Sequence, residues 1–164
     1  MQAAIDVDIE DDSPPTVPVA CVGARVLVVE DDDALRGLVV ETLASGGFDV
    51  NEANSGRDAL ATLESMGLDA WPAKGVDIVV VDMCMPGLNG LDVIRSLRRS
   101  PWPTPTILMT AFPSPDVITE ARRLGALVLA KPFALHVLTR ATVALLVGRD
   151  SANDNDPLRG VRWS

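Results

Sequence analysis

Five short apolar runs, separated by segments with helical spacing, constrain the fold of this chain more than any other feature. The runs occupy residues 26–29, 48–53, 78–81, 106–109 and 127–129. They are too short for typical helices, and their branched apolar side chains suit strands buried on both faces of a sheet. Helical spacing follows each run, over residues 34–43, 55–66, 91–97, 115–124 and 133–147. This alternation predicts an α/β fold, a doubly wound five-stranded parallel sheet with five helices.

The two ends of the chain differ in composition from the segment between them. Residues 1–24 carry five acids and three prolines but no basic residue, which predicts a disordered tail. Residues 25–148 are expected to form one domain with a single core. Residues 149–164 read as a polar tail that is too short to form an output domain. Residues 67–75, which include Trp71, are expected to form a loop.

Charge and cysteine usage exclude several classes of protein. The net charge is −9, from 14 basic and 23 acidic residues, which argues against nucleic-acid binding. Arg95, Arg98 and Arg99 are expected to lie on a solvated helix face. Cys21 and Cys84 form neither a disulfide framework nor a zinc site and are expected to be reduced. No run is long enough for a membrane span, and the N-terminus does not resemble a secretory signal, so a cytoplasmic location is expected.

Polar residues follow four of the five predicted strands. Glu30 and Asp31 follow the first, Asp82 the third, Thr110 the fourth and Lys131 the fifth. The carboxyl ends of parallel strands meet at one edge, where ligands of open sheets bind. Carboxylates crowded there repel one another unless a hard cation such as Mg²⁺ relieves the repulsion. A carboxylate can attack phosphorus to form an acyl phosphate, and a lysine and a hydroxyl can bind the phosphoryl oxygens.

Four segments, in this order and spacing, resemble the response-regulator receiver domains of two-component signal transduction. They are VLVVEDDDALR at 26–36, VVVDMCMPGLNGLDVIRSLR at 79–98, ILMTA at 107–111 and AKPF at 130–133. The resemblance covers residues 25 to about 147. It implies a flavodoxin-like fold with strand order 2-1-3-4-5. It also implies a cis peptide bond before Pro132.

The resemblance also implies a role for each residue of the candidate site. Asp82 would be the phosphoacceptor, Thr110 the switch hydroxyl and Lys131 the residue that senses the phosphoryl group. The ligands of Mg²⁺ would be Asp31, Asp82, the backbone carbonyl of Cys84 and, through a water, Glu30. Asp32 and Asp33 are expected to cap the first helix rather than to bind metal.

Two features depart from the family pattern. Val128 stands where an aromatic residue is common, and the segment from Gly125 to Lys131 is one residue shorter than usual. The usual coupling of a threonine to a rotating aromatic ring is therefore in question. The switch would run through loop and helix movement instead, or be weak.

The predicted function is that of a single-domain response regulator. It would take a phosphoryl group from a sensor histidine kinase or a histidine phosphotransfer protein, as in a phosphorelay. It would then bind a protein partner through its fourth helix, fifth strand and fifth helix, near Val128, His136 and Arg140, as a monomer or a phosphorylation-dependent dimer. It would not be an enzyme beyond acting on its own phosphoryl group. A phosphate sink and a phosphorylation-independent binding module remain alternatives.

Two other classes fit the residues less well. A dehalogenase-type phosphatase needs a second aspartate two residues after its nucleophile, where this chain has Cys84. A flavodoxin-like redox protein needs a phosphate-binding loop after its first strand. Glu30 and Asp31, which follow that strand here, would repel a phosphate.

Overall fold

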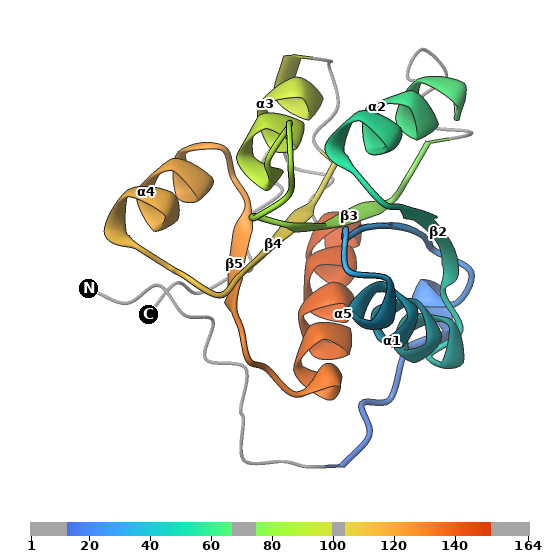
Figure 1. Cartoon of the computed structure of the whole chain (residues 1–164). Helices are drawn as coiled ribbons and strands as arrows, with labels where there is room; N and C mark the ends of the chain where they lie inside the picture. Colours follow the sequence, from blue (N-terminus) through green and yellow to red (C-terminus); the bar gives the residue numbers. More distant parts are fainter. Residues whose placement is uncertain (1–12, 67–74, 100–103, 152–164) are drawn as a thin grey trace.

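The computed structural model describes residues 13–66, 75–99 and 104–151, which form five parallel strands and their flanking helices (Figure 1). The strands are β1 (Arg25–Val29), β2 (Asp49–Ala53), β3 (Ile78–Asp82), β4 (Thr106–Thr110) and β5 (Leu127–Ala130). The helices are η1 (Val19–Cys21, a 3₁₀ turn), α1 (Asp33–Ser45), α2 (Gly56–Ser65), α3 (Gly90–Arg99), α4 (Pro115–Arg123) and α5 (Leu135–Ser151). The order of the strands in the sheet is β2-β1-β3-β4-β5, which confirms the predicted order.

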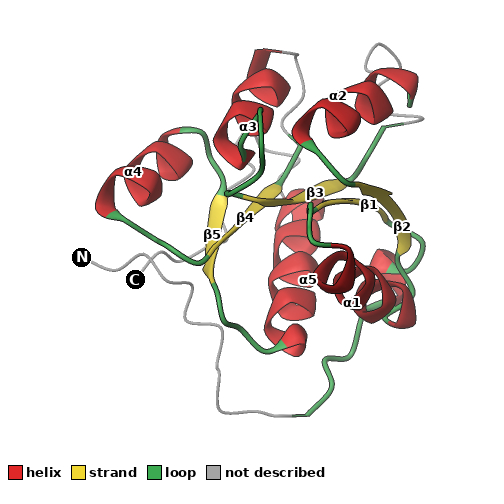
Figure 2. Cartoon of the chain, in the orientation of Figure 1, coloured by secondary structure: helices red, strands yellow, loops and turns green. Residues whose placement is uncertain are grey.

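Helices cover both faces of this sheet, as Figure 2 shows, with α1 and α5 on one face and α2, α3 and α4 on the other. Alternate residues of each central strand enter different cores. Leu27, Val79 and Leu108 pack with the α2 and α3 side chains. Val28 and Val80 pack with those of α1 and α5. All five residues of β3 are buried, as expected for a central parallel strand covered on both faces.

Side-chain caps begin helices α1, α2 and α4. Asp32 accepts a hydrogen bond from the N–H of Leu35 and caps α1, which confirms the predicted capping role. Ser55 caps α2 and Ser114 caps α4 in the same way. These caps fix where the helices begin after the loops at the carboxyl ends of β1, β2 and β4.

Two boundaries differ from those expected. Residues 1–24 are expected to form a disordered tail, but Cys21 in η1 is 2% exposed and belongs to the core under α1 and α5. Residues 1–12 lie outside the described residues, as do Trp71 and residues 67–74. At the other end, α5 continues to Ser151, beyond the predicted helix end at 147 and the domain boundary at 148. No helix in the described ranges has the length and apolar character to cross a membrane.

The expectation that the three arginines of α3 face solvent is wrong for Arg98 and is met in part for Arg95, whose side chain is 41% exposed. Arg98 is partly buried, and its guanidinium donates to the carbonyl oxygens of Leu124 and Thr104, at 2.8 and 2.9 Å. Arg95 is half-buried and forms ion pairs with Asp92 of its own helix and Glu120 of α4. Arg99 is exposed, as expected.

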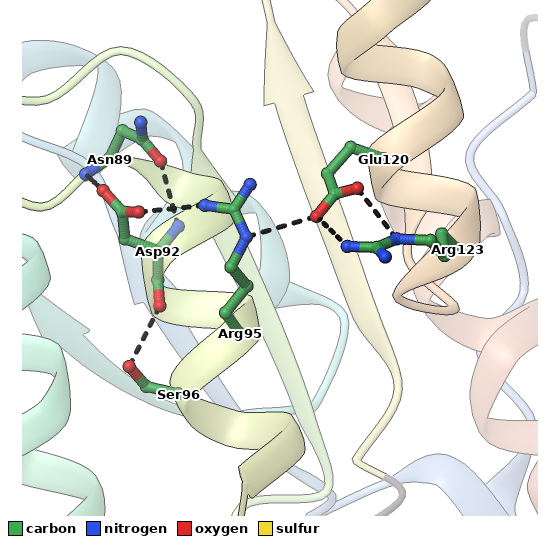
Figure 3. A network of polar contacts seen from close by, with 6 residues as sticks. All are labelled: Asn89, Asp92, Arg95, Ser96, Glu120 and Arg123. Atoms are coloured by element: carbon green, nitrogen blue, oxygen red, sulfur yellow. Dashed lines mark hydrogen bonds and ion pairs between the residues drawn. The ribbon is translucent and has the colours of Figure 1, made fainter.

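A polar network joins α3 to α4 through Arg95 (Figure 3). Asn89 and Asp92 exchange backbone and side-chain hydrogen bonds at the start of α3. Arg95 then bridges Asp92 to Glu120, and Glu120 also accepts hydrogen bonds from Nε and Nη2 of Arg123. The network therefore links the end of the loop after β3 to the last turns of α4.

Candidate functional site

The carboxyl ends of β1 and β3 bring three acids together. Glu30 follows β1 directly, Asp31 comes next and Asp82 is the last residue of β3. One carboxylate oxygen from each of the three lies within 4.8 Å of the others. Glu30 and Asp82 are buried, whereas Asp31 is exposed. Three carboxylates with one side open to solvent are a donor set that suits a hard divalent cation such as Mg²⁺.

Lys131 is placed among these acids by β5. Its Nζ donates to Asp82 Oδ1 at 2.7 Å and to Glu30 Oε2 at 3.1 Å. The side chains of Glu30, Asp82 and Lys131 are 2%, 7% and 20% exposed, so the ion pairs are shielded from bulk water. The ammonium group thus balances part of the negative charge of the site.

The charges of this cluster act on one another. Burial raises the pKa of Glu30, and the negative charge of Asp82 raises it further. Hydrogen bonds from the N–H of Asp32 and from Lys131 act in the opposite direction, but the net pKa of Glu30 is raised. Burial alone would lower the pKa of Lys131. Hydrogen bonds to Asp82 and Glu30 and their negative charges outweigh burial, and the pKa of Lys131 is raised. The lysine is therefore a cation at neutral pH.

The backbone around Asp82 is tightly packed. The N–H of Met83 donates to the carbonyl of Met109, and the N–H of Gly90 donates to the carbonyl of Met83. A Cβ at Gly90 would lie 2.5 Å from the carbonyl oxygen of Asp82 and 2.6 Å from Leu108 Cδ1. Only a glycine fits there, so the loop after Asp82 folds back directly onto the end of β3.

Thr110 and Cys84 lie beside the charged cluster. Thr110 ends β4, between β3 and β5, and is buried. Its Oγ1 accepts a hydrogen bond from the N–H of Phe112 at 3.1 Å, which engages the hydroxyl with the loop before α4. Cys84 lies two residues after Asp82 and is an exposed residue. The Lys131–Pro132 peptide bond is cis, as the family resemblance implied.

The residue that the sequence analysis missed is Arg36. It lies in the first turn of α1 and contacts the backbone carbonyl of Glu30. The only signal in the sequence was its spacing of three residues from Asp33, which allows an ion pair on a helix surface. That spacing gave no hint of the contact with Glu30.

Comparison of the sequence with known proteins finds a matching family and related regulators. The family model described as the response regulator receiver domain matches residues 26–143. Regulatory protein AtoC of Escherichia coli (strain K12) is 36% identical over 115 residues, which are 70% of this chain and 23% of that protein. The alkaline phosphatase synthesis transcriptional regulatory protein SphR of Synechococcus elongatus is 35% identical over 131 residues, 79% of this chain and 51% of that protein.

Solved structures give the same result. The chemotaxis protein CheY4 of Vibrio cholerae is 30% identical with a TM-score of 0.62, over 73% of this chain and 95% of that chain. The receiver domain of the Francisella response regulator 1452 is 27% identical with a TM-score of 0.66, over 77% of this chain and 98% of that chain. The chain spans only about half or less of the two curated regulators named above. With the family model matched from β1 into α5, this chain belongs to the response regulator receiver domains of two-component signalling.

Proposed function

We propose that this chain accepts a phosphoryl group on Asp82 and changes its binding to a protein partner as a result. The observation that carries the proposal is the cluster of Glu30, Asp31 and Asp82 with Lys131 2.7 Å from Asp82. Three carboxylates and an ammonium group meet at one edge of the sheet, and the carboxylate of Asp82 would be the nucleophile. Receiver domains act as phosphoacceptor switches, and we expect no turnover of an external substrate.

The acids have a second role as ligands. Asp31 and Asp82 would hold Mg²⁺ directly, with the backbone carbonyl of Cys84, and Glu30 would bind it through a water. Bound there, the ion would neutralise charge on the incoming phosphoryl group. The exposure of Asp31 fits a site that takes its metal and phosphoryl donor from solvent.

The transfer itself requires one bond to form and one to break. An oxygen of the Asp82 carboxylate attacks phosphorus, and the bond from phosphorus to the imidazole nitrogen of a phosphohistidine breaks. The imidazole leaves and takes up a proton. The donor would be a sensor histidine kinase or a histidine phosphotransfer protein. Lys131, whose Nζ donates to Asp82 and Glu30, would pair with the new oxygens.

Phosphorylation would then shift the loop before α4. Thr110 is expected to turn from the N–H of Phe112 toward the phosphoryl oxygens, which releases that loop. Val128 in β5 is half-buried and packs against the core beside α4, so no aromatic ring is available there to follow the threonine. The face formed by α4, β5 and α5 is the proposed binding surface for a downstream protein.

Phosphorylation by a small donor tests the proposal. With Mg²⁺ and phosphoramidate, the protein should gain one phosphoryl group that is stable in acid and labile in base. Asp82→Asn should abolish the gain, because the amide is a poor nucleophile. Asp49→Asn is the matched control. Asp49 is an exposed acid at the start of β2, whereas Asp82 lies at the end of β3. Labelling that persists in Asp82→Asn would refute the assignment.

A second experiment separates the switch from the alternatives of a phosphate sink and a phosphorylation-independent module. Partner capture is compared for the free protein and for the protein with beryllofluoride, a phosphoryl mimic. Capture that depends on the mimic supports the switch. Equal capture supports the independent module, and rapid phosphoryl turnover without capture supports the sink.

The cytoplasmic location remains a prediction.

A further inference from the structure

Arg36 reaches back from α1 to the turn that carries the acids of the site. Its Nη1 donates to the backbone carbonyl of Glu30 at 3.0 Å, and its Nη2 donates to Asp33 Oδ1 at 2.6 Å. The side chain is 14% exposed, although it lies on a surface helix. The two ends of the guanidinium therefore hold the two ends of the turn formed by residues 30–33.

The ion pairs of Arg36 contribute less to the arrangement of this turn than its hydrogen bond to Glu30 does. Its ion-pair partners are exposed, with Asp33 at 88% and Glu52, 3.6 Å away, at 55%. Ion pairs of this kind stabilise a protein by about 1 kcal/mol or less. The bond to the carbonyl of Glu30 is different, because it fixes the backbone next to a buried acid.

Glu30 is held from several sides. Its N–H donates to the carbonyl of Ala53, and its Oε1 accepts from the N–H of Asp32. Arg36 donates to the backbone carbonyl of Glu30, which belongs to the peptide group that joins Glu30 to Asp31. Asp31 is exposed, so its place in the cluster depends on the backbone on either side of it. Asp32 is fixed on the far side as the cap of α1.

We propose that Arg36 is a positioning residue for the metal-binding acids. It holds the turn of residues 30–33 so that Glu30 and Asp31 face Asp82, and it keeps the carboxylate of Asp33 engaged outside the cluster. This inference rests on the proposed function, because it concerns the same site. It adds a residue that touches neither the phosphoryl group nor the cation.

Charge and positioning predict opposite results when Arg36 is changed. Removal of a positive charge near three acids should by itself tighten the binding of a cation. Removal of a side chain that positions the ligands should weaken it, and loss of such supporting contacts costs roughly tenfold or more in metal affinity. The direction of the change in Mg²⁺ affinity therefore separates the two roles.

The test is Mg²⁺ titration of the unphosphorylated protein by isothermal calorimetry. Arg36→Gln should bind Mg²⁺ about tenfold more weakly than the wild type. Arg36→Lys keeps the charge but offers a single point of contact, so it should also bind weakly. Arg122→Gln, which removes an exposed arginine from the last turn of α4, should bind normally. In NMR exchange measurements, the amides of Asp31 and Asp32 should exchange faster in Arg36→Gln but not in Arg122→Gln.

Equal or tighter binding by Arg36→Gln would overturn the positioning role, as would full affinity in Arg36→Lys. Circular dichroism checks that each variant is folded. If Arg36→Gln does not fold, Arg36→Lys provides the test instead. If the wild type takes up phosphoryl groups and binds Mg²⁺ while Arg36→Gln is unchanged, only this inference fails. If the wild type does neither, the proposed function fails with it.

Discussion

Lys131 donates a hydrogen bond to Asp82 at 2.7 Å across the intervening strand β4, between two residues 49 positions apart. The same ammonium group contacts Glu30, 101 positions away. One lysine thus joins the ends of β1, β3 and β5. It offsets repulsion between two buried carboxylates, and it is the cation that we propose pairs with the phosphoryl group.

Lys131→Met should destabilise the protein when divalent cations are absent. Glu30 and Asp82 would lose their shared cation while they remain buried. We expect the free energy of unfolding to fall by about 1–3 kcal/mol, which is less than for a fully buried pair because the site is partly open to water. Added Mg²⁺ should recover part of the loss. Urea denaturation with and without Mg²⁺ measures both effects. A variant as stable as the wild type in EDTA would contradict the expected repulsion.

Gly90→Ala should directly disturb Asp82, the proposed phosphoacceptor. The new Cβ would lie 2.5 Å from the Asp82 carbonyl oxygen, which forces the loop or the end of β3 to move. We expect a loss of about 1–3 kcal/mol in the free energy of unfolding, together with slower phosphorylation.

Gly37→Ala is the control for this glycine. Gly37 lies within α1, and a Cβ there meets nothing within 4 Å. Alanine should stabilise the helix by up to about 1 kcal/mol and leave the phosphorylation rate unchanged. If both variants lower the rate equally, the close packing of Gly90 on Asp82 is not the cause.

Glu120→Gln should weaken the link between α3 and α4 in a pH-dependent way. Hydrogen bonds from Arg123, and then from Arg95, lower the pKa of Glu120 from 4.5. A lowered pKa means that the unfolded state binds more protons, so this stabilisation is present above pH 4.5 and is lost as the pH falls through the folded-state value. The urea midpoint of the variant should lie below that of the wild type at pH 7. The two midpoints should converge in more acidic buffer, and a constant difference would exclude an ionic contribution.

Arg98→Met should be more damaging than loss of an exposed arginine. Arg98 donates to the carbonyls of Leu124 and Thr104 and to Thr106 Oγ1, which joins α3 to the start of β4 and the end of α4. Methionine fills similar space but satisfies none of these acceptors, so we expect a loss of about 2–3 kcal/mol. Arg99→Met is the control, and thermal denaturation of both variants provides the comparison. Equal melting temperatures would show that water replaces the guanidinium at no cost.

The arginines show where prediction from the sequence stopped. Helical spacing placed Arg95, Arg98 and Arg99 together on α3, and charge alone favoured solvent for all three. The acceptors of Arg98 include Leu124, 26 positions away, and Arg95 binds Glu120, 25 positions away. Nothing in the local sequence gives the approach of α4 to α3. Cys21 is a similar case, because its burial depends on packing next to α5 and not on the composition of the tail.

By itself, the sequence determined the strands, the helices and the edge at which the polar residues gather. Short apolar runs form parallel strands, and the residues that follow such strands must meet at one edge of the sheet. It therefore predicted that Glu30, Asp31, Asp82 and Lys131 would lie together. Only the tertiary structure decided which acids pair with the lysine and that Arg36 and Arg98 turn inward. Long flexible side chains choose their partners among groups that packing brings close, and local periodicity carries no record of that choice.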